Sequence, residues 1–329
     1  MRAKIARLPL AAAALALLAS PPASAYRWDE HYYTVRLAYG AREGGAVAAL
    51  CSQLADEAPE LNAIEVYRRL MLHPLDYASW TLRGAGPDKT VGRMVTIQQL
   101  LHGLTGGSPD AVRAVARDAA RALGGVLRAE KDPQKRSDAQ CALGFALHLY
   151  GDSFSHTRLK NPSKMYPTGL GHFFDATMPD QPLSSAARLE LWRNYLSSAA
   201  ELISEGGSAA FEPVFAAAAA FQGRARSENG FAREELLRAE TAALKGGGID
   251  ASPIEHNASD RPCQEIADAA AKGLPAAPSC ENAWALYRDA AIRAFDAYDA
   301  DPAHASAPSR GAIWRPFFRG SPFSKGASR

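Results

Sequence analysis

Two histidines and an aspartate recur at intervals of four residues in segment 138–156, at His148, Asp152 and His156. Because an α-helix advances about 100° per residue, these three side chains would fall within about 80° of one another. Apolar residues of the same segment form a stripe almost opposite Asp152: Leu143, Leu147, Tyr150 and Phe154. The pattern predicts a helix with one apolar face for the core and one face made of His, Asp and His.

Histidine and carboxylate side chains at this spacing favour metal binding. Each step of four residues rises about 6 Å along a helix, so His148 and His156 would lie about 12 Å apart along the axis. That span is too long for one shared ion and predicts two ions, with Asp152 between them. The alternative is a solvated polar face, but residues 139–157 contain no Lys, Arg or Glu, the usual residues of such a face.

The first 25 residues have the features of an export signal. Arg2, Lys4 and Arg7 precede an apolar run over 8–18, and Ala-Ser-Ala at 23–25 matches a small-x-small cleavage site. We expect cleavage near Ala25 and a secreted or periplasmic protein. No later stretch reaches the roughly 20 apolar residues that a membrane span needs.

The net charge of the chain does not favour nucleic acid as the substrate. The whole chain has a formal charge of +2, and loss of the three signal cations leaves about −1. A nearly neutral chain weakly favours a phospholipid or small phosphoester over polymeric nucleic acid, which stays open as a substrate. We expect one all-α metal-binding domain over 26–300 and an aromatic, basic tail over 301–329.

The four cysteines suit an oxidising compartment. Cys263 and Cys280 could close a short loop, whereas Cys51 and Cys141 lie in predicted helices and are either bridged or simply buried. No CxxC pair is present, so any zinc would be held by His and Asp rather than by Cys.

Apolar periodicity predicts helices throughout and no strand of useful length, hence an all-α multi-helix bundle with a metal-binding cleft. Gly and Pro residues separate the helices. The predicted helices cover residues 28–39, 46–57, 64–72, 91–104, 108–129, 138–156, 184–205, 212–221, 231–245 and 282–298.

The tail carries five cations, no acid after residue 303, and aromatic residues between the cations. We favour a strap that packs its aromatics on the domain. The alternative is a docking segment that contacts an anionic membrane surface or polymer. The residues concerned are Arg310, Trp314, Arg315, Phe317, Phe318, Arg319, Phe323, Lys325 and Arg329.

The order of the His and Asp residues resembles the zinc-dependent phospholipase C and single-strand-specific nuclease superfamily, and most closely an uncharacterised bacterial branch of it. The resemblance covers residues 28–180. It implies an exported all-α protein with a zinc cluster in a cleft, and zinc ligands at His31, Asp56, His73, His148, Asp152, His156 and His172.

The resemblance also implies a catalytic carboxylate. Asp76, three residues after His73, matches the general base that would deprotonate the attacking water, although spacing alone equally fits a helix end followed by a cap. His102 would line the cleft near the substrate or serve as a further ligand. The implied activity is an exported zinc-dependent phosphoester hydrolase.

The chain departs from the superfamily pattern at three positions. In the superfamily, the tryptophan at the mature N-terminus binds zinc through its free amine. Here the nearest tryptophan is Trp28, two residues inside the predicted mature start. The interval from Asp152 to His156 is shorter than in the family. In the superfamily, a carboxylate lies four residues after the histidine that His172 matches. Here that position is Ala176, with Asp175 and Asp180 nearby. Two or three zinc ions therefore stay open, as do a non-catalytic zinc-binding protein and an exported interaction module.

Overall fold

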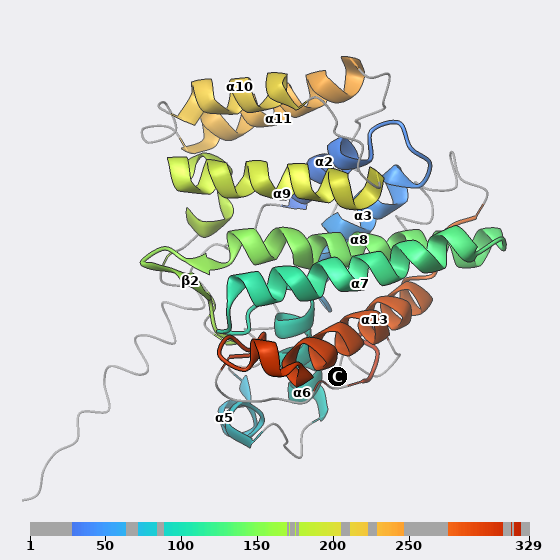
Figure 1. The fold of residues 1–329 in the computed structure, drawn as a ribbon, viewed down its shortest axis with the longest axis vertical. Coiled ribbons are helices and arrows are strands. Elements are labelled where there is room, and N and C mark those ends of the chain that lie inside the picture. The colour runs from blue at the N-terminus through green and yellow to red at the C-terminus, as the bar shows by residue number, and fades with distance from the viewer. Residues whose placement is uncertain are drawn as a thin grey trace, which may run out of the picture.

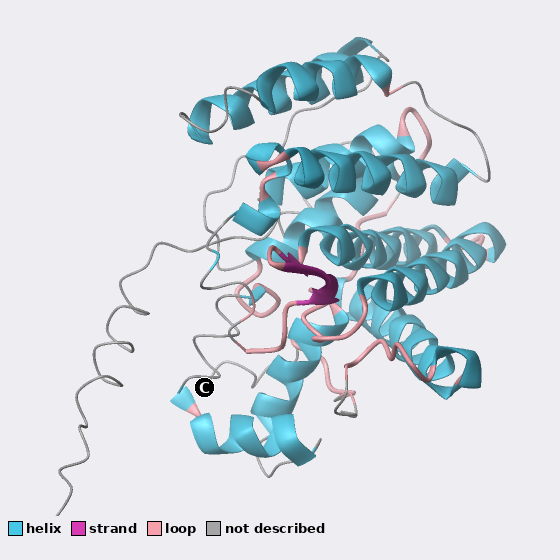
Figure 2. Ribbon diagram, turned by 60° about the vertical axis from the view of Figure 1, so that its left-hand side comes forward, coloured by secondary structure: helices cyan, strands magenta, loops and turns pink. Residues whose placement is uncertain are grey.

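The computed structural model describes residues 28–63, 72–83, 89–169, 171, 175, 178–204, 211–222, 229–246, 276–311, 317 and 319–323. The expected signal segment and most of the helix expected over 64–72 lie outside this part. The described chain is helical apart from one short hairpin, so the all-α prediction is confirmed (Figure 2). Among the described residues, no helix is long and apolar enough to span a membrane.

Helix α8 (Pro133–Ser155) is the central element of the fold. It lies between α9 (Ala186–Ser204) and α7 (Pro109–Ala129), with α13 (Cys280–Ala300) beyond α7 (Figure 1). Every residue over 137–155 is buried. Neighbouring helices also cover the side that carries His148 and Asp152, so this side is not the solvated polar face that the sequence left as an alternative.

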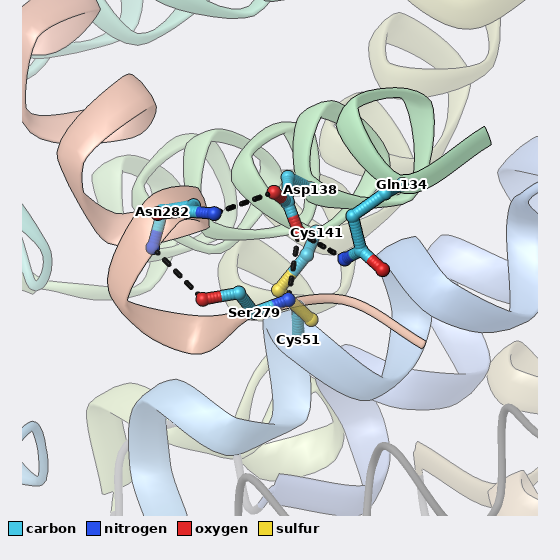
Figure 3. Close-up of a disulfide and its surroundings, with 6 residues drawn as sticks. All are labelled: Cys51, Gln134, Asp138, Cys141, Ser279 and Asn282. Atoms are coloured by element: carbon cyan, nitrogen blue, oxygen red, sulfur yellow. Dashed lines mark hydrogen bonds between the residues drawn. A yellow bond between two sulfur atoms is a disulfide. The ribbon is translucent and has the colours of Figure 1, made fainter. Parts of the chain in front are cut away.

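Helices α2 (Trp28–Tyr39) and α3 (Gly45–Glu57) pack on each other, and α3 packs closely along α8. A Cβ at Gly144 of α8 would lie 2.3 Å from the Ala48 carbonyl oxygen of α3. The approach therefore needs glycine at position 144. A disulfide between Cys51 and Cys141 joins the same two helices and resolves the alternative left open by the sequence (Figure 3).

Asp138 of α8 ties the start of α13 to this helix pair. Its carboxylate accepts hydrogen bonds from the Ser279 backbone amide (2.6 Å), Asn282 Nδ2 (3.0 Å) and Gln134 Nε2 (3.0 Å) (Figure 3). Ser279 also caps α13, since its hydroxyl accepts from the Asn282 amide. Cys280 is disulfide-bonded, and the predicted partner Cys263 lies outside the described residues.

The segment after α8 forms a small antiparallel hairpin, β1 (Thr157–Arg158) and β2 (Asn161–Met165). The sequence predicted an irregular connection here, because strands this short give no readable alternation. Backbone bonds from Met165 to Gly107 and from Tyr166 to His156 fix the hairpin beside the start of α7. The hairpin therefore holds the end of α8 against the turn that precedes α7.

The remaining elements cover the two sides of this centre. Helices α10 (Glu212–Gln222) and α11 (Asn229–Gly246) form a pair next to α9, whereas α5 (Pro74–Arg83) and α6 (Lys89–Leu100) lie at the opposite side (Figure 1). Short 3-10 turns follow the hairpin and α13: η2 (Met178–Asp180), η3 (Pro182–Ser184) and η4 (Pro302–His304).

Two described tail residues pack on the domain. Buried Arg310 forms ion pairs with Asp296 and Asp299 of α13, and its guanidinium lies over the ring of Phe317. Phe317 in turn packs on Phe295, with ring centroids 5.1 Å apart. These contacts are those of a strap, whereas Trp314 and Phe318 lie outside the described residues.

Candidate metal centre

Seven buried His and Asp residues from distant parts of the sequence meet beside α8. Each is at most 5% exposed. Helices α2 and α3 each contribute one residue, the turn after α6 contributes another, and the rest come from α8, its end and η2. The residues are His31, Asp56, His102, His148, Asp152, His156 and Asp180.

Asp152 stands between two sets of histidines. Its Oδ1 lies 3.3 Å from His31 Nε2, whereas its Oδ2 lies 3.1 Å from both His102 Nδ1 and His148 Nε2. His156 Nδ1 is 3.6 Å from the same Oδ2. His156 caps the C-terminus of α8 and leaves helical geometry, so its ring turns back towards Asp152 despite the axial distance expected from the sequence.

Asp56 repeats this arrangement at slightly longer range. Its Oδ2 lies 3.7 Å from His31 Nε2, and its Oδ1 lies 3.8 Å from both His102 Nδ1 and His148 Nε2. Two sets of three ligand atoms fall within 4.8 Å of one another: His31, Asp56 and His148, and His102, His148 and Asp152. Asp56 and Asp152 each direct one oxygen towards His31 and the other towards His102 and His148. This arrangement suits two ions about 4 Å apart.

The hydrogen bonds of His102 indicate which ring nitrogen carries the proton. His102 Nε2 donates to the Leu61 carbonyl oxygen (2.8 Å), so the neutral ring presents a lone pair at Nδ1. That lone pair faces Asp152 Oδ2 at 3.1 Å and His148 Nε2 at 3.2 Å. Acceptors this close need a proton or a metal cation between them, and a carbonyl partner on the second nitrogen is typical of a metal-bound histidine.

His156 is oriented in the same way from its other nitrogen. Its Nδ1 donates to the His102 carbonyl oxygen (2.6 Å), and its Nε2 lies 3.5 Å from Asp180 Oδ1. Burial lowers the pKa of His156, but the carboxylates of Asp152 and Asp180 outweigh burial and raise it to about 9. Without a metal, His156 therefore carries a proton at neutral pH.

Burial dominates the pKa shifts of His148 and Asp56 but not that of Asp152. Burial and the adjacent His31 hold the pKa of His148 at about 3. Burial, reinforced by Asp152, raises the pKa of Asp56 well above its usual range. Burial opposes ionisation of Asp152 too, but His156 and His148 outweigh it and lower that pKa.

Two buried atoms of the cluster, Asp56 Oδ2 and His148 Nδ1, have no hydrogen-bond partner among the described residues. Together with the pKa shifts, they describe a site short of positive charge, which divalent ions would supply.

Glycines allow the contributing segments to approach. A Cβ at Gly151 would lie 3.0 Å from His31 Cε1 and 2.9 Å from Tyr195 Cζ, so a side chain there would displace the histidine of α2. Gly103 follows His102 with a φ of 61°, a conformation that favours glycine and reverses the chain at the end of α6. His102 is thereby held facing α8.

The structure does not bring every predicted site residue into this cluster. His73 is exposed just before α5, and Asp76 is half-buried on α5. Neither belongs to the two groups of ligand atoms found among the described residues. His172 lies outside the described residues. His102, expected to line a cleft or act as a ligand, lies inside the cluster with no exposed surface.

Asp180 is the one cluster residue that lies outside the predicted site residues. It had been noted only as a carboxylate near Ala176. The sequence contains one indication of this role. Position 176 lacks the carboxylate of the superfamily pattern, so a nearby acid such as Asp180 could replace it as a ligand. Its position beside His156 depends on the hairpin and η2, neither of which the sequence pattern predicts.

Comparisons with protein-family models, curated proteins and solved structures give no match for this chain. The interpretation of the site therefore depends on its own residues and geometry.

Proposed function

We propose that this chain is an exported zinc-dependent phosphoester hydrolase that holds two zinc ions in the buried His and Asp cluster. The observation that carries the proposal is the placement of Asp152, whose Oδ1 faces His31 while its Oδ2 faces His102 and His148. Asp56 faces the same two sets with its own two oxygens. A donor set of imidazoles and carboxylates without thiolate suits zinc in an exported protein.

In this proposal five residues hold the ion pair: His31, Asp56, His102, His148 and Asp152. His156 and Asp180 form a second pair of donors at the end of α8, at which a further ion would bind. His73 and Asp76 take no part here, because they lie on or beside α5 and outside the buried cluster.

Zinc held in such a site lowers the pKa of a bound water and neutralises charge on a phosphate group. The chain's own residues contribute orientation. Leu61 and His102 carbonyl groups fix the imidazoles of His102 and His156, so their free nitrogens are directed before any ion binds. The same reaction class is implied by the sequence resemblance, with a phospholipid or another phosphodiester as substrate.

The test combines zinc content with hydrolysis. We expect elemental analysis of the purified protein to give two zinc per chain, falling by at least one in Asp152→Ala. Hydrolysis of bis(4-nitrophenyl) phosphate or phosphatidylcholine should fall at least 100-fold in the same variant, because several kcal/mol of charge stabilisation is lost. Asp118→Ala, on the exposed side of α7, is the matched control and should keep both properties. Absence of zinc after reconstitution would contradict the proposal.

Burial favours a second function, a closed zinc site that stabilises the fold without catalysis. The cluster residues are at most 5% exposed, and structural zinc sites are closed whereas catalytic ones keep an open position. Zinc binding that depends on Asp152, combined with no hydrolysis of either substrate, would select this function over the hydrolase.

A further inference from the structure

A groove of about 990 Å³ runs along the side of α7, between α7, α8, α9 and the turn after α2. Its volume is at the upper end for sites that bind small organic molecules. Side chains from four separate elements line it, including Arg42, Arg117, Arg121, Arg128, Arg136 and Tyr39. The groove is therefore a feature of the folded domain rather than of one helix surface.

The charge of the groove is strongly positive. Five arginines line it and only two acids, Glu43 and Glu201, which leaves an excess of three positive charges in a chain whose formal net charge is only +2. Arg117, Arg121 and Arg128 lie on one face of α7 and span about 16 Å along its axis. Guanidinium groups spread over that distance can engage separate anionic groups of one ligand.

The floor of the groove is apolar but contains a polar atom without a partner. Tyr39, Leu143 and Tyr150 line it and are at most 6% exposed. The hydroxyl of Tyr39 is buried and has no hydrogen-bond partner among the described residues. This hydroxyl is closed off from solvent, so the groove offers a ligand an apolar floor and a rim of arginines.

The groove and the metal centre use opposite faces of α8. At 100° per residue, Leu143 and Tyr150 lie about 140° and 160° around the helix from His148 and Asp152, respectively. Neither Leu143 nor Tyr150 belongs to the buried His and Asp cluster. The groove is therefore a separate site, and its occupancy does not depend on the proposed hydrolase activity.

We propose that this groove binds a soluble organic molecule that carries two separated phosphate groups. Arginine presents a planar fork of donors that matches phosphate oxygens, and two phosphates carry a charge close to the excess of the groove. A ring attached to the part that carries the phosphates lies on the floor formed by Tyr39 and Leu143. The concave floor favours such a molecule over the flat surface of a membrane.

The experiment measures binding of adenosine 3′,5′-bisphosphate to the zinc-loaded protein by calorimetry. We expect Arg117→Glu/Arg121→Glu to weaken binding more than tenfold, because two cations of the groove become anions. The control Lys131→Glu/Lys135→Glu reverses two exposed cations outside the groove and should weaken binding less than threefold. Equal losses in the two variants, or no binding at 1 mM bisphosphate, would overturn the proposal.

Three further measurements make the test specific. Adenosine and inorganic phosphate should each bind at least tenfold more weakly than the bisphosphate, because each supplies only part of the contacts. Asp152→Ala should keep bisphosphate affinity within threefold, which separates this site from the metal centre. Vesicles of phosphatidylglycerol that bind through the same arginines while the bisphosphate does not would replace the soluble ligand with a lipid headgroup and so contradict the proposal.

Discussion

The two faces of α8 use charge in opposite ways. On one face, seven His and Asp side chains are almost completely removed from water and contact mainly each other and backbone carbonyls. On the other face, arginines surround a groove open to solvent, and only its floor is buried. Protonation of the first set depends on its neighbours, whereas water and salt screen the second set.

Because of this difference, substitutions on the two faces should have different effects, on stability at the buried cluster and on ligand binding at the groove. Buried charges are costly unless they are paired, so a change in the metal centre alters the stability of the fold. Exposed ion pairs contribute little, so a change in the groove alters affinity for a ligand far more than stability. The predictions below compare matched changes on the two faces, and the first is the largest.

We expect zinc to stabilise the protein through the buried face alone. At free zinc about 1,000-fold above its dissociation constant, the free energy of unfolding should rise by about 4 kcal/mol for each ion bound. Asp152→Asn should abolish this increase because it removes the carboxylate that faces both histidine sets. Urea unfolding with zinc and with chelator measures the difference, and Arg117→Glu/Arg121→Glu should retain it. Equal zinc stabilisation in Asp152→Asn would place the ions elsewhere.

The same glycine-to-alanine change should have opposite effects in the two regions. Gly144→Ala puts a Cβ 2.3 Å from the Ala48 carbonyl oxygen, so α3 and α8 must separate, at a cost of about 2 kcal/mol. Gly125→Ala in α7 meets nothing closer than an Arg128 nitrogen at 4.0 Å and should stabilise the helix by about 0.8 kcal/mol. Thermal unfolding of both variants tests this, and a neutral Gly144→Ala would mean that the helices separate without cost.

Affinity for a further zinc ion at His156 and Asp180 should depend on pH. Its pKa of about 9 lies above its unfolded value, so the proton stabilises the metal-free fold fully below about pH 6.5. That stabilisation is lost as pH rises through about 9. If zinc takes this nitrogen, the proton must leave, so affinity should rise about tenfold per pH unit between pH 7 and 9.

Calorimetry in buffers of different ionisation enthalpy counts the released protons. We expect at least one at pH 7, and fewer in His156→Asn than in the parent protein. The groove variant Arg117→Glu/Arg121→Glu is the control and should release as many as the parent. Zinc binding without proton release at pH 7 would exclude His156 as a ligand.

The sequence predicted the helical class and the local part of the buried His and Asp cluster. His148 and Asp152 could be paired because a single helix fixes their relative positions at a spacing of four. The resemblance to the superfamily added His31 and Asp56, because their order along the chain matches the order of its zinc ligands. The same reasoning placed His73 and Asp76 with them, but their position depends on how α5 packs, which local periodicity does not encode.

Other features depend on tertiary packing and left no pattern to read. Asp180 lies beside His156 on η2, after a hairpin that backbone bonds hold against residues about 60 positions earlier, such as Met165 to Gly107. The groove collects Arg42, Arg117 and Arg136 from three elements, and along the chain each resembles an ordinary exposed cation. Only the folded chain shows that these arginines line one groove, together with the buried side chain of Tyr39.

The smallest effect should be the stability change on reversing charge in the groove. Arg117→Glu/Arg121→Glu should alter the free energy of unfolding by no more than about 0.5 kcal/mol, as expected for exposed positions. The reversal removes the Arg121–Asp118 contact, which is more than 60% exposed at both partners, but it also relieves repulsion among the five arginines. Because these contributions oppose each other, the sign should change with salt concentration, which urea unfolding at low and high ionic strength can follow. A loss comparable to that of Asp152→Asn would show instead that the groove arginines stabilise the fold, and the contrast between the two faces of α8 would no longer hold.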